Sequence, residues 1–211
     1  MAQPGSTDIS AELIPAFRDE LCLDFANTRY WRGTEMPTDD LRGIGDVVEW
    51  CKSSGVLSQT DAAVARRWWE ERPDLAGPAF LEAVALREAL YAVFRAIADG
   101  KEPALDAMRT LNDALARAPS RLGVERHAGR FSWRVPRLDA PTVAALLAPV
   151  VWSGTELLLG SRLPRVRHCA NERCLWLFLD DSKSGTRRWC SMASCGNRAK
   201  AHRHYARRKK R

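Results

Sequence analysis

Four cysteines near the end of the chain form the pattern with the most specific chemistry. They make two C-x4-C pairs separated by fifteen residues. Thiolates are preferred zinc ligands, and four of them placed as two short pairs can converge tetrahedrally on one ion. An iron–sulfur cluster or a redox switch could use the same thiols. The spacing predicts one structural zinc ion with four ligands, namely Cys169, Cys174, Cys190 and Cys195.

The other two cysteines, Cys22 and Cys51, each stand alone among apolar residues. A free cysteine in such a context usually packs as a small apolar side chain. We therefore expect both thiols to be buried and to take no part in metal binding.

The sequence lacks the patterns that most often carry catalysis. It contains no motif that pairs a nucleophile with a base, no glycine-rich phosphate loop and no His-Glu metal motif. We therefore expect that the protein is not an enzyme.

Charge is distributed unevenly along the chain. The net charge is +7, but residues 1–164 hold 19 lysines and arginines against 23 acidic residues, whereas residues 165–211 hold 14 against 3. The basic excess belongs to the part of the chain that carries the four paired cysteines. A cationic segment of this density favours a polyanionic partner. The division predicts two domains, residues 1–164 and residues 165–211.

The order of motifs around the cysteines is typical of a treble-clef-like zinc finger. A first metal turn at residues 169–174 is followed by an expected hairpin over residues 176–189, and a second turn at residues 190–195 leads into a basic C-terminal helix. The apolar core of such a module is small, so metal binding must supply much of its folding free energy.

The finger and its helix carry residue types that contact nucleic acids. DNA is the expected partner, and RNA or another protein are the alternatives. Asn197 and Arg198 suit adenine and guanine edges, but beside Cys195 they could instead bond the zinc sulfurs or cap the helix. The candidate nucleic-acid-binding residues are Arg187, Arg188, Asn197, Arg198, Lys200, Arg203, Arg207 and Arg208.

Apolar periodicity predicts a mainly α fold for residues 1–164, with one small β-hairpin over residues 121–136. The helices over residues 78–99 and 102–117 should form an antiparallel pair, and Pro149 should kink the last helix. The predicted helices cover residues 46–51, 62–71, 78–99, 102–117 and 142–159.

Polar residues follow directly after an apolar start near the N-terminus. Asp24, Asn27 and Arg29 could line a pocket for a small-molecule effector, which would suit a helical domain that senses a signal. The alternative is that Asp24 or Asn27 caps a helix N-terminus by accepting from free backbone amides.

Neither a membrane span nor a secretory signal is expected. The longest apolar run, residues 143–152, contains a proline and is roughly half of the ~20 residues that a spanning helix needs. The first ten residues carry no basic residue, and no apolar stretch follows them. We expect a cytoplasmic, nucleoid-associated protein whose oligomeric state the sequence leaves open.

Two stretches of sequence resemble known families. The tetrapeptide Cys195-Gly196-Asn197-Arg198, together with the two cysteine pairs, resembles the CGNR zinc finger. The stretch Leu21-Cys22-Leu23-Asp24-Phe25-Ala26-Asn27-Thr28-Arg29 resembles the opening of the ABATE domain, which accompanies this finger in bacterial proteins described as stress-induced transcription regulators. The resemblance implies that the protein is a bacterial regulator that binds DNA.

Overall fold

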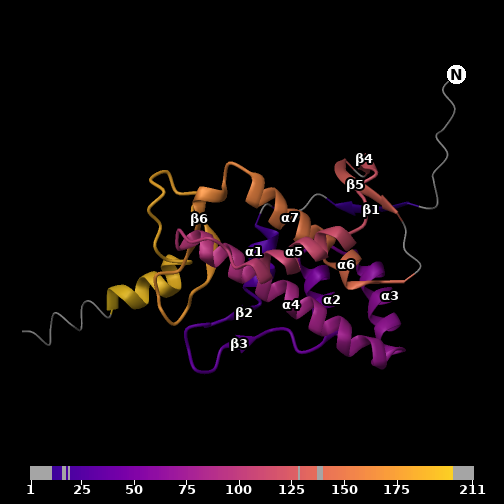
Figure 1. Cartoon of the computed structure of the whole chain (residues 1–211), viewed down its shortest axis with the longest axis horizontal. Helices are drawn as coiled ribbons and strands as arrows, with labels where there is room; N and C mark the ends of the chain where they lie inside the picture. Colours follow the sequence, from indigo (N-terminus) through magenta and orange to yellow (C-terminus); the bar gives the residue numbers. More distant parts are fainter. Residues whose placement is uncertain (1–10, 16–17, 19, 128, 137–139, 202–211) are drawn as a thin grey trace, which may run out of the picture.

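Figure 1 shows the computed structural model of the chain, which describes residues 11–15, 18, 20–127, 129–136 and 140–201. Within these residues helices predominate, so the fold is mainly α, as the sequence predicts. None of the described helices is both long enough and apolar enough to span a bilayer. The helices are α1 (Leu21–Ala26), α2 (Ile44–Ser53), α3 (Gln59–Glu70), α4 (Pro73–Ala98), α5 (Leu105–Arg117), α6 (Val143–Leu146) and α7 (Ala148–Leu159), and the strands are β1 (Ala11–Pro15), β2 (Arg29–Tyr30), β3 (Thr38–Asp39), β4 (Gly123–His127), β5 (Arg130–Pro136), β6 (Val166–His168) and β7 (Leu177–Leu179).

Helices α4 and α5 form the predicted antiparallel pair. Arg117 at the end of α5 forms an ion pair with Glu82 (3.2 Å), while Ala107 near the start of α5 packs with Val93 further along α4. Helix α4 begins earlier than the periodicity predicts, at Pro73. A proline at the first helical position needs no partner for an N–H, and its fixed φ suits a helix.

The helix predicted over residues 142–159 is divided into α6 and α7 at Leu147. Thr142 caps α6 by accepting a hydrogen bond from the backbone N–H of Ala145 (3.1 Å). Pro149 lies in the first turn of α7. Its ring would clash with the carbonyl of Ala145 if one continuous helix ran through both residues. The expected kink is thus a break between two short helices.

The predicted hairpin is present as β4 and β5, which turn at Gly129 with φ of +80°. Strand β1 pairs with the other edge of β5, so the described sheet has the order β1-β5-β4. Ile14 lies opposite Trp133, and both pack with Val135 and Trp152 in a small apolar cluster. Strand β1 is not predicted by the local sequence pattern, because its pairing depends on residues more than a hundred positions away.

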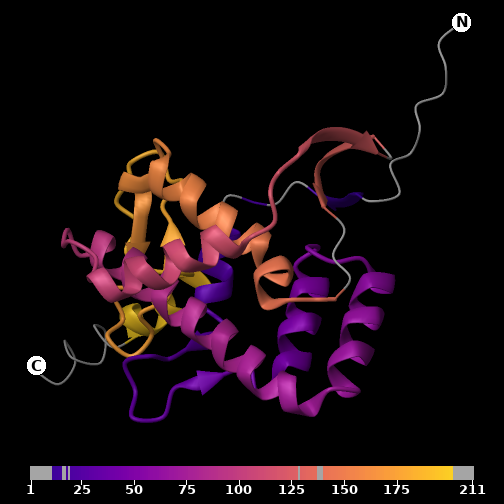
Figure 2. The same cartoon turned by 45° about the vertical axis from the view of Figure 1, so that its right-hand side comes forward.

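The main core surrounds α1 and includes residues from the finger. Phe25 and Cys22 of α1 are fully buried, as is Cys51 of α2, and the two cysteines pack as apolar side chains as expected. Burial raises the pKa of the Cys22 thiol to about 12, so this thiol stays protonated at neutral pH. Val166 and Leu177, from the two finger strands, belong to the same core. Figure 2 shows the finger beside α1 and α4, against which its strands pack.

Candidate zinc centre and nucleic-acid interface

Strands β6 and β7 flank the first cysteine pair and close a turn around it. Val166 pairs with Leu179 and His168 pairs with Leu177, and the backbone N–H of Cys169 donates to the carbonyl of Trp176 (2.8 Å). The prediction of a hairpin over residues 176–189 is therefore wrong. Strand β7, which follows the first metal turn, pairs with β6, which precedes that turn, and not with the residues after β7.

Residues after β7 form a loop that one carboxylate organises. The Asp180 side chain is fully buried and accepts from the backbone N–H groups of Ser182 (3.0 Å) and Arg187 (2.8 Å). These bonds satisfy backbone donors that a hairpin ladder would otherwise use. The loop brings Arg188 back to the first turn, where its carbonyl accepts from the N–H of Ala170 (2.8 Å).

The second cysteine pair leads into helical backbone. A five-residue π-helical turn, Met192–Gly196, carries Cys195, and α-helical residues follow as far as residue 201. A Cβ atom at Gly196 would lie 2.8 Å from the Met192 sulfur, so a larger residue there would require the exposed Met192 side chain to move. The described part of the chain therefore contains the start of the predicted basic helix.

The four sulfur atoms form one compact cluster. The sulfurs of Cys169, Cys174, Cys190 and Cys195 all lie within 4.8 Å of one another, and the sulfurs of Cys174 and Cys190 are 3.7 Å apart. A tetrahedral zinc ion with Zn–S bonds of about 2.3 Å separates its sulfurs by about 3.8 Å. The cluster therefore fits one structural zinc ion.

Protonation of the thiols supports the same conclusion. Hydrogen bonds from the thiols of Cys174 and Cys190 lower the pKa of Cys169. Hydrogen bonds to Cys169 and Cys174 in turn raise the pKa of Cys190. One thiolate is thus stable beside the other thiols, whereas full ionisation requires a cation among them. Zinc supplies that charge when bound.

Two residues that the sequence analysis missed enclose the sulfurs. The Asn171 side chain donates from Nδ2 to the sulfur of Cys195 (3.5 Å). Trp31, from the helical domain, packs with Trp176 and Trp189 against the cysteines. A closed, mostly buried set of four thiolates is typical of a structural site rather than a catalytic one. The position of Asn171 between Cys169 and Cys174 could have indicated a contact with the zinc ligands. Trp31 is too distant from the cysteines in sequence for such a contact to be predicted.

The residues considered for an effector pocket are divided between different contacts. Asn27 is buried at the C-terminus of α1, where Nδ2 donates to the carbonyl of Leu177 (2.8 Å) and Oδ1 accepts from its N–H (3.0 Å). Asp24 pairs with Arg18, and Arg29 lies 3.9 Å from Glu88. Neither Asp24 nor Asn27 caps the start of α1, which follows Glu20. The effector pocket itself stays a prediction.

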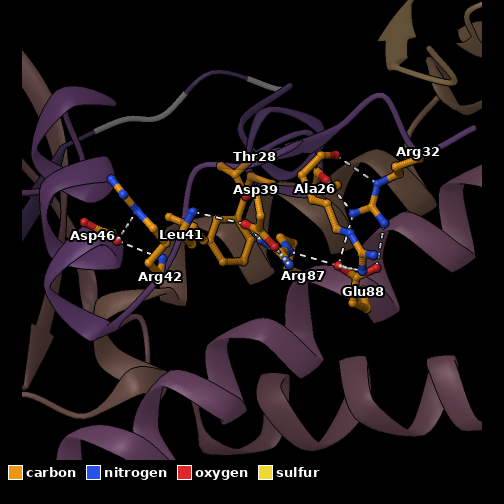
Figure 3. Close-up of polar contacts among 11 residues, drawn as sticks. Ala26, Thr28, Arg32, Asp39, Leu41, Arg42, Asp46, Arg87 and Glu88 are labelled. Carbon is orange, nitrogen blue, oxygen red and sulfur yellow. Dashed lines mark hydrogen bonds and ion pairs between the residues drawn. The ribbon is translucent and has the colours of Figure 1, made fainter. Parts of the chain in front are cut away.

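A network of ion pairs fixes the segment between α1 and α2 onto α4 (Figure 3). Arg87 is 1% exposed, and its guanidinium holds both carboxylate oxygens of Asp39 (2.6 and 2.7 Å). Glu88, next in the chain, accepts from Arg32 (2.6 Å). Burial raises the pKa of Asp39, but the hydrogen bonds from Arg87 and from the Leu41 N–H, together with the charges of Arg87 and Arg29, lower it below its ordinary value.

The same network reaches the finger. Arg32 stacks over the ring of Tyr91 at 3.8 Å, and the Tyr91 hydroxyl donates to the carbonyl of Leu175, directly after the first metal turn (3.0 Å). Together with the bonds of Asn27, these contacts hold the finger in one position against α1 and α4.

The described candidates for nucleic-acid contact have different surroundings. Arg187 donates to the carbonyls of Trp189 (2.9 Å) and Cys190, so it braces the second metal turn. Asn197 donates to the carbonyl of Ala193 (3.3 Å), and Arg198 lies 4.8 Å from the ring of Trp31. Arg188 and Lys200 are exposed, while three further candidates lie outside the described residues, namely Arg203, Arg207 and Arg208.

The helical domain and the four-cysteine site together define a zinc-finger protein with a helical domain before the finger. Two family models match the chain: the ABATE model, described as "putative stress-induced transcription regulator", over residues 19–161, and the CGNR zinc finger over residues 165–208. The chain therefore belongs to the ABATE family and carries a CGNR zinc finger. No curated protein matches it.

Proposed function

We propose that this protein is a bacterial transcription regulator that binds DNA through its zinc finger and basic C-terminal segment. The observation that carries this proposal is the charge of residues 165–211, where 14 lysines and arginines stand against 3 acidic residues beside the zinc site. Such a segment gains affinity for a phosphate backbone by releasing condensed counterions. Family membership supports the same role.

The helical domain has a separate role in this proposal. It senses a signal, with a small molecule as the simplest effector, and passes the change to the finger through their shared core. The protein acts by binding and not by catalysis, and it works in the cytoplasm on the nucleoid. Asn27 and Tyr91 supply physical connections for such coupling, because they bond to Leu177 and Leu175 of the finger. Arg32 stacks on Tyr91 from the helical side.

Direct titration tests the proposal. Zinc-loaded, full-length protein is titrated by fluorescence anisotropy with random duplex DNA, single-stranded DNA and RNA at two salt concentrations. The double variant Arg207→Ala/Arg208→Ala should weaken duplex binding and lower the slope of log affinity against log salt by up to ~2. Substitutions are preferable to a truncation at residue 164, because that truncation would remove Val166 and Leu177 from the core.

The three polymers separate the alternatives. Salt-sensitive binding that favours duplex DNA supports a regulator. Stronger binding to RNA or single strands would favour the RNA-binding alternative, for which Trp176, Trp189 or Tyr205 would act as stacking surfaces. If no polymer binds at moderate salt, the finger instead serves a protein partner.

A further inference from the structure

An open groove of about 1470 Å³ runs between the helical domain and the zinc finger. One wall is the segment after β2, from Trp31 to Met36. The opposite wall consists of the first metal turn, Arg188 and Trp189, and the start of the C-terminal helix. The groove thus has walls from both family domains and lies directly beside Cys195.

Three arginines face this groove, namely Arg173, Arg188 and Arg198. Within the described part of the chain, none of the three forms an ion pair with a carboxylate. Arginines of the helical domain such as Arg32, Arg87 and Arg95 are ion-paired. The groove therefore presents three guanidinium groups that form no ion pair with the described carboxylates, although Glu35 and Glu172 also line it.

Trp31 shapes the groove from the helical side. Its φ of +55° is a left-handed conformation that bulky residues rarely adopt. The backbone N–H (3.0 Å) and hydroxyl (2.7 Å) of Thr34 both donate to the Trp31 carbonyl, and the N–H of Gly33 donates to the carbonyl of Arg173 (3.3 Å). These bonds hold the indole ring against the finger.

Trp31 also restrains Arg198. The Arg198 guanidinium carbon lies 4.8 Å from the centre of the indole ring, which is a cation–π contact. A stacked guanidinium keeps its N–H donors at the rim of the plane, where they remain free to bind phosphate oxygens. The ring therefore fixes the position of a cation without neutralising it.

We propose that this groove binds the sugar-phosphate backbone of duplex DNA, and that Trp31 is a positioning residue that holds Arg198 for a phosphate contact. This proposal rests on the DNA-binding function proposed above. It adds the helical domain to the DNA interface, together with Arg173, which motif analysis of the finger leaves out. DNA is the occupant because three guanidinium groups without carboxylate partners in one groove complement the phosphates of a nucleic-acid backbone.

The sharpest test is a substitution that should increase affinity. Glu35 is an exposed carboxylate on the groove wall, where it repels phosphate. Glu35→Gln should tighten binding of random duplex DNA by about two- to fivefold at low salt. A folding defect cannot produce such a gain. The matched control is Asp113→Asn, which neutralises an exposed carboxylate on α5 and should leave affinity unchanged.

Charge removal gives the opposite result. Arg173→Ala should weaken duplex binding by about five- to tenfold near 0.1 M salt and lower the salt slope by about 0.9, the value for one phosphate contact. Arg109→Ala, an exposed arginine of α5, is the control. Trp31→Ala should also weaken binding, and Trp31→Phe should recover most of the loss because it keeps an aromatic face. Zinc content is measured for each variant.

The outcomes separate this proposal from the proposed function. If the wild-type protein does not bind duplex DNA, both fail. If the wild type binds and Arg207→Ala/Arg208→Ala weakens it, while Glu35→Gln and Arg173→Ala change neither affinity nor salt slope, the groove is not part of the interface although the protein binds DNA. If the groove variants alter binding only to RNA or single strands, duplex DNA is not the occupant.

Discussion

The side chain of Asn27 forms both hydrogen bonds of a peptide group with the backbone of Leu177. Its Nδ2 donates to the Leu177 carbonyl (2.8 Å), and its Oδ1 accepts from the Leu177 N–H (3.0 Å). Asn27 ends the first helix, whereas Leu177 begins a strand of the zinc finger. Because both residues are buried, the pair joins the two parts of the chain where water cannot replace either bond.

Asn27→Ala should destabilise the protein by about 2–4 kcal/mol, because it leaves a buried donor and a buried acceptor without partners. Chemical denaturation of the zinc-loaded protein measures the free energy of unfolding. Asn112→Ala, at an exposed position on α5, is the control and should change it little. Equal stability of the Asn27 and Asn112 variants would contradict a joining role for Asn27.

Cys190→Ser should abolish stoichiometric zinc binding and unfold the second metal turn, because only three thiolates remain in the cluster. Most of the helical signal in circular dichroism should persist, since the helices are concentrated before residue 165. Zinc is quantified by atomic spectroscopy, with Ser194→Ala as the matched control. A Cys190→Ser protein that retains one zinc ion per chain would refute the four-cysteine site.

Gly33→Ala should displace the finger from the helical domain. A Cβ atom at this position would lie 1.6 Å from the Glu172 carbonyl oxygen, and both partners are backbone, so no side chain can move aside. The variant should unfold at lower temperature and lose zinc faster to a chelator.

The control for this variant is Gly45→Ala within α2. Apart from the local backbone, only the end of the Arg66 side chain lies within 4 Å of the added Cβ there (3.9 Å). Alanine favours a helix by up to about 1 kcal/mol over glycine, so this variant should be at least as stable as the wild type. Identical melting of the two variants would show that the approach of Gly33 to the finger is not tight.

The Arg87–Asp39 pair predicts a pH-dependent effect. Asp39→Asn should cost about 3 kcal/mol at pH 7, because it removes a partner of the almost fully buried Arg87. The folded-state pKa of Asp39 is lowered, so its stabilising contribution is present above the unfolded pKa of about 3.9 and is lost as the pH falls through the folded value.

The measurement is the free energy of unfolding of wild type and Asp39→Asn from pH 7 to pH 3. The difference between the two proteins should be constant near neutrality and shrink below about pH 4, where wild-type Asp39 also becomes neutral. Using this difference removes the acid sensitivity of the zinc ligands, which both proteins share. A difference that stays constant to pH 3 would show that the Asp39 carboxylate does not stabilise the fold.

Sequence patterns predicted the features that depend on neighbouring residues. The zinc ligands followed from cysteine spacing, the helix pair from apolar periodicity, and the hairpin at Gly129 from alternation. Features that depend on distant partners were missed. The pairing of β6 with β7 replaced the expected hairpin because Asp180 satisfies the backbone of the following loop.

The candidate site shows the same division. The two cysteine pairs could be assigned from spacing alone, but the place of Trp31 against them depends on the packing of α1, α4 and the finger. The role of Asn27 could not be predicted either, because its partner is a backbone group of Leu177 and the residue types in the sequence do not indicate such a bond.

The shared core imposes an order on folding during synthesis. Asn27 and Leu177 are separated by 150 positions in the chain, and a ribosome adding about 5–20 residues per second needs roughly 8–30 s to make that stretch. Throughout this interval the apolar surface of the first helix lacks the strands that cover it. The earliest helix to be synthesised is therefore among the last to be enclosed, and the nascent chain is exposed to aggregation and proteolysis until the zinc-binding cysteines emerge.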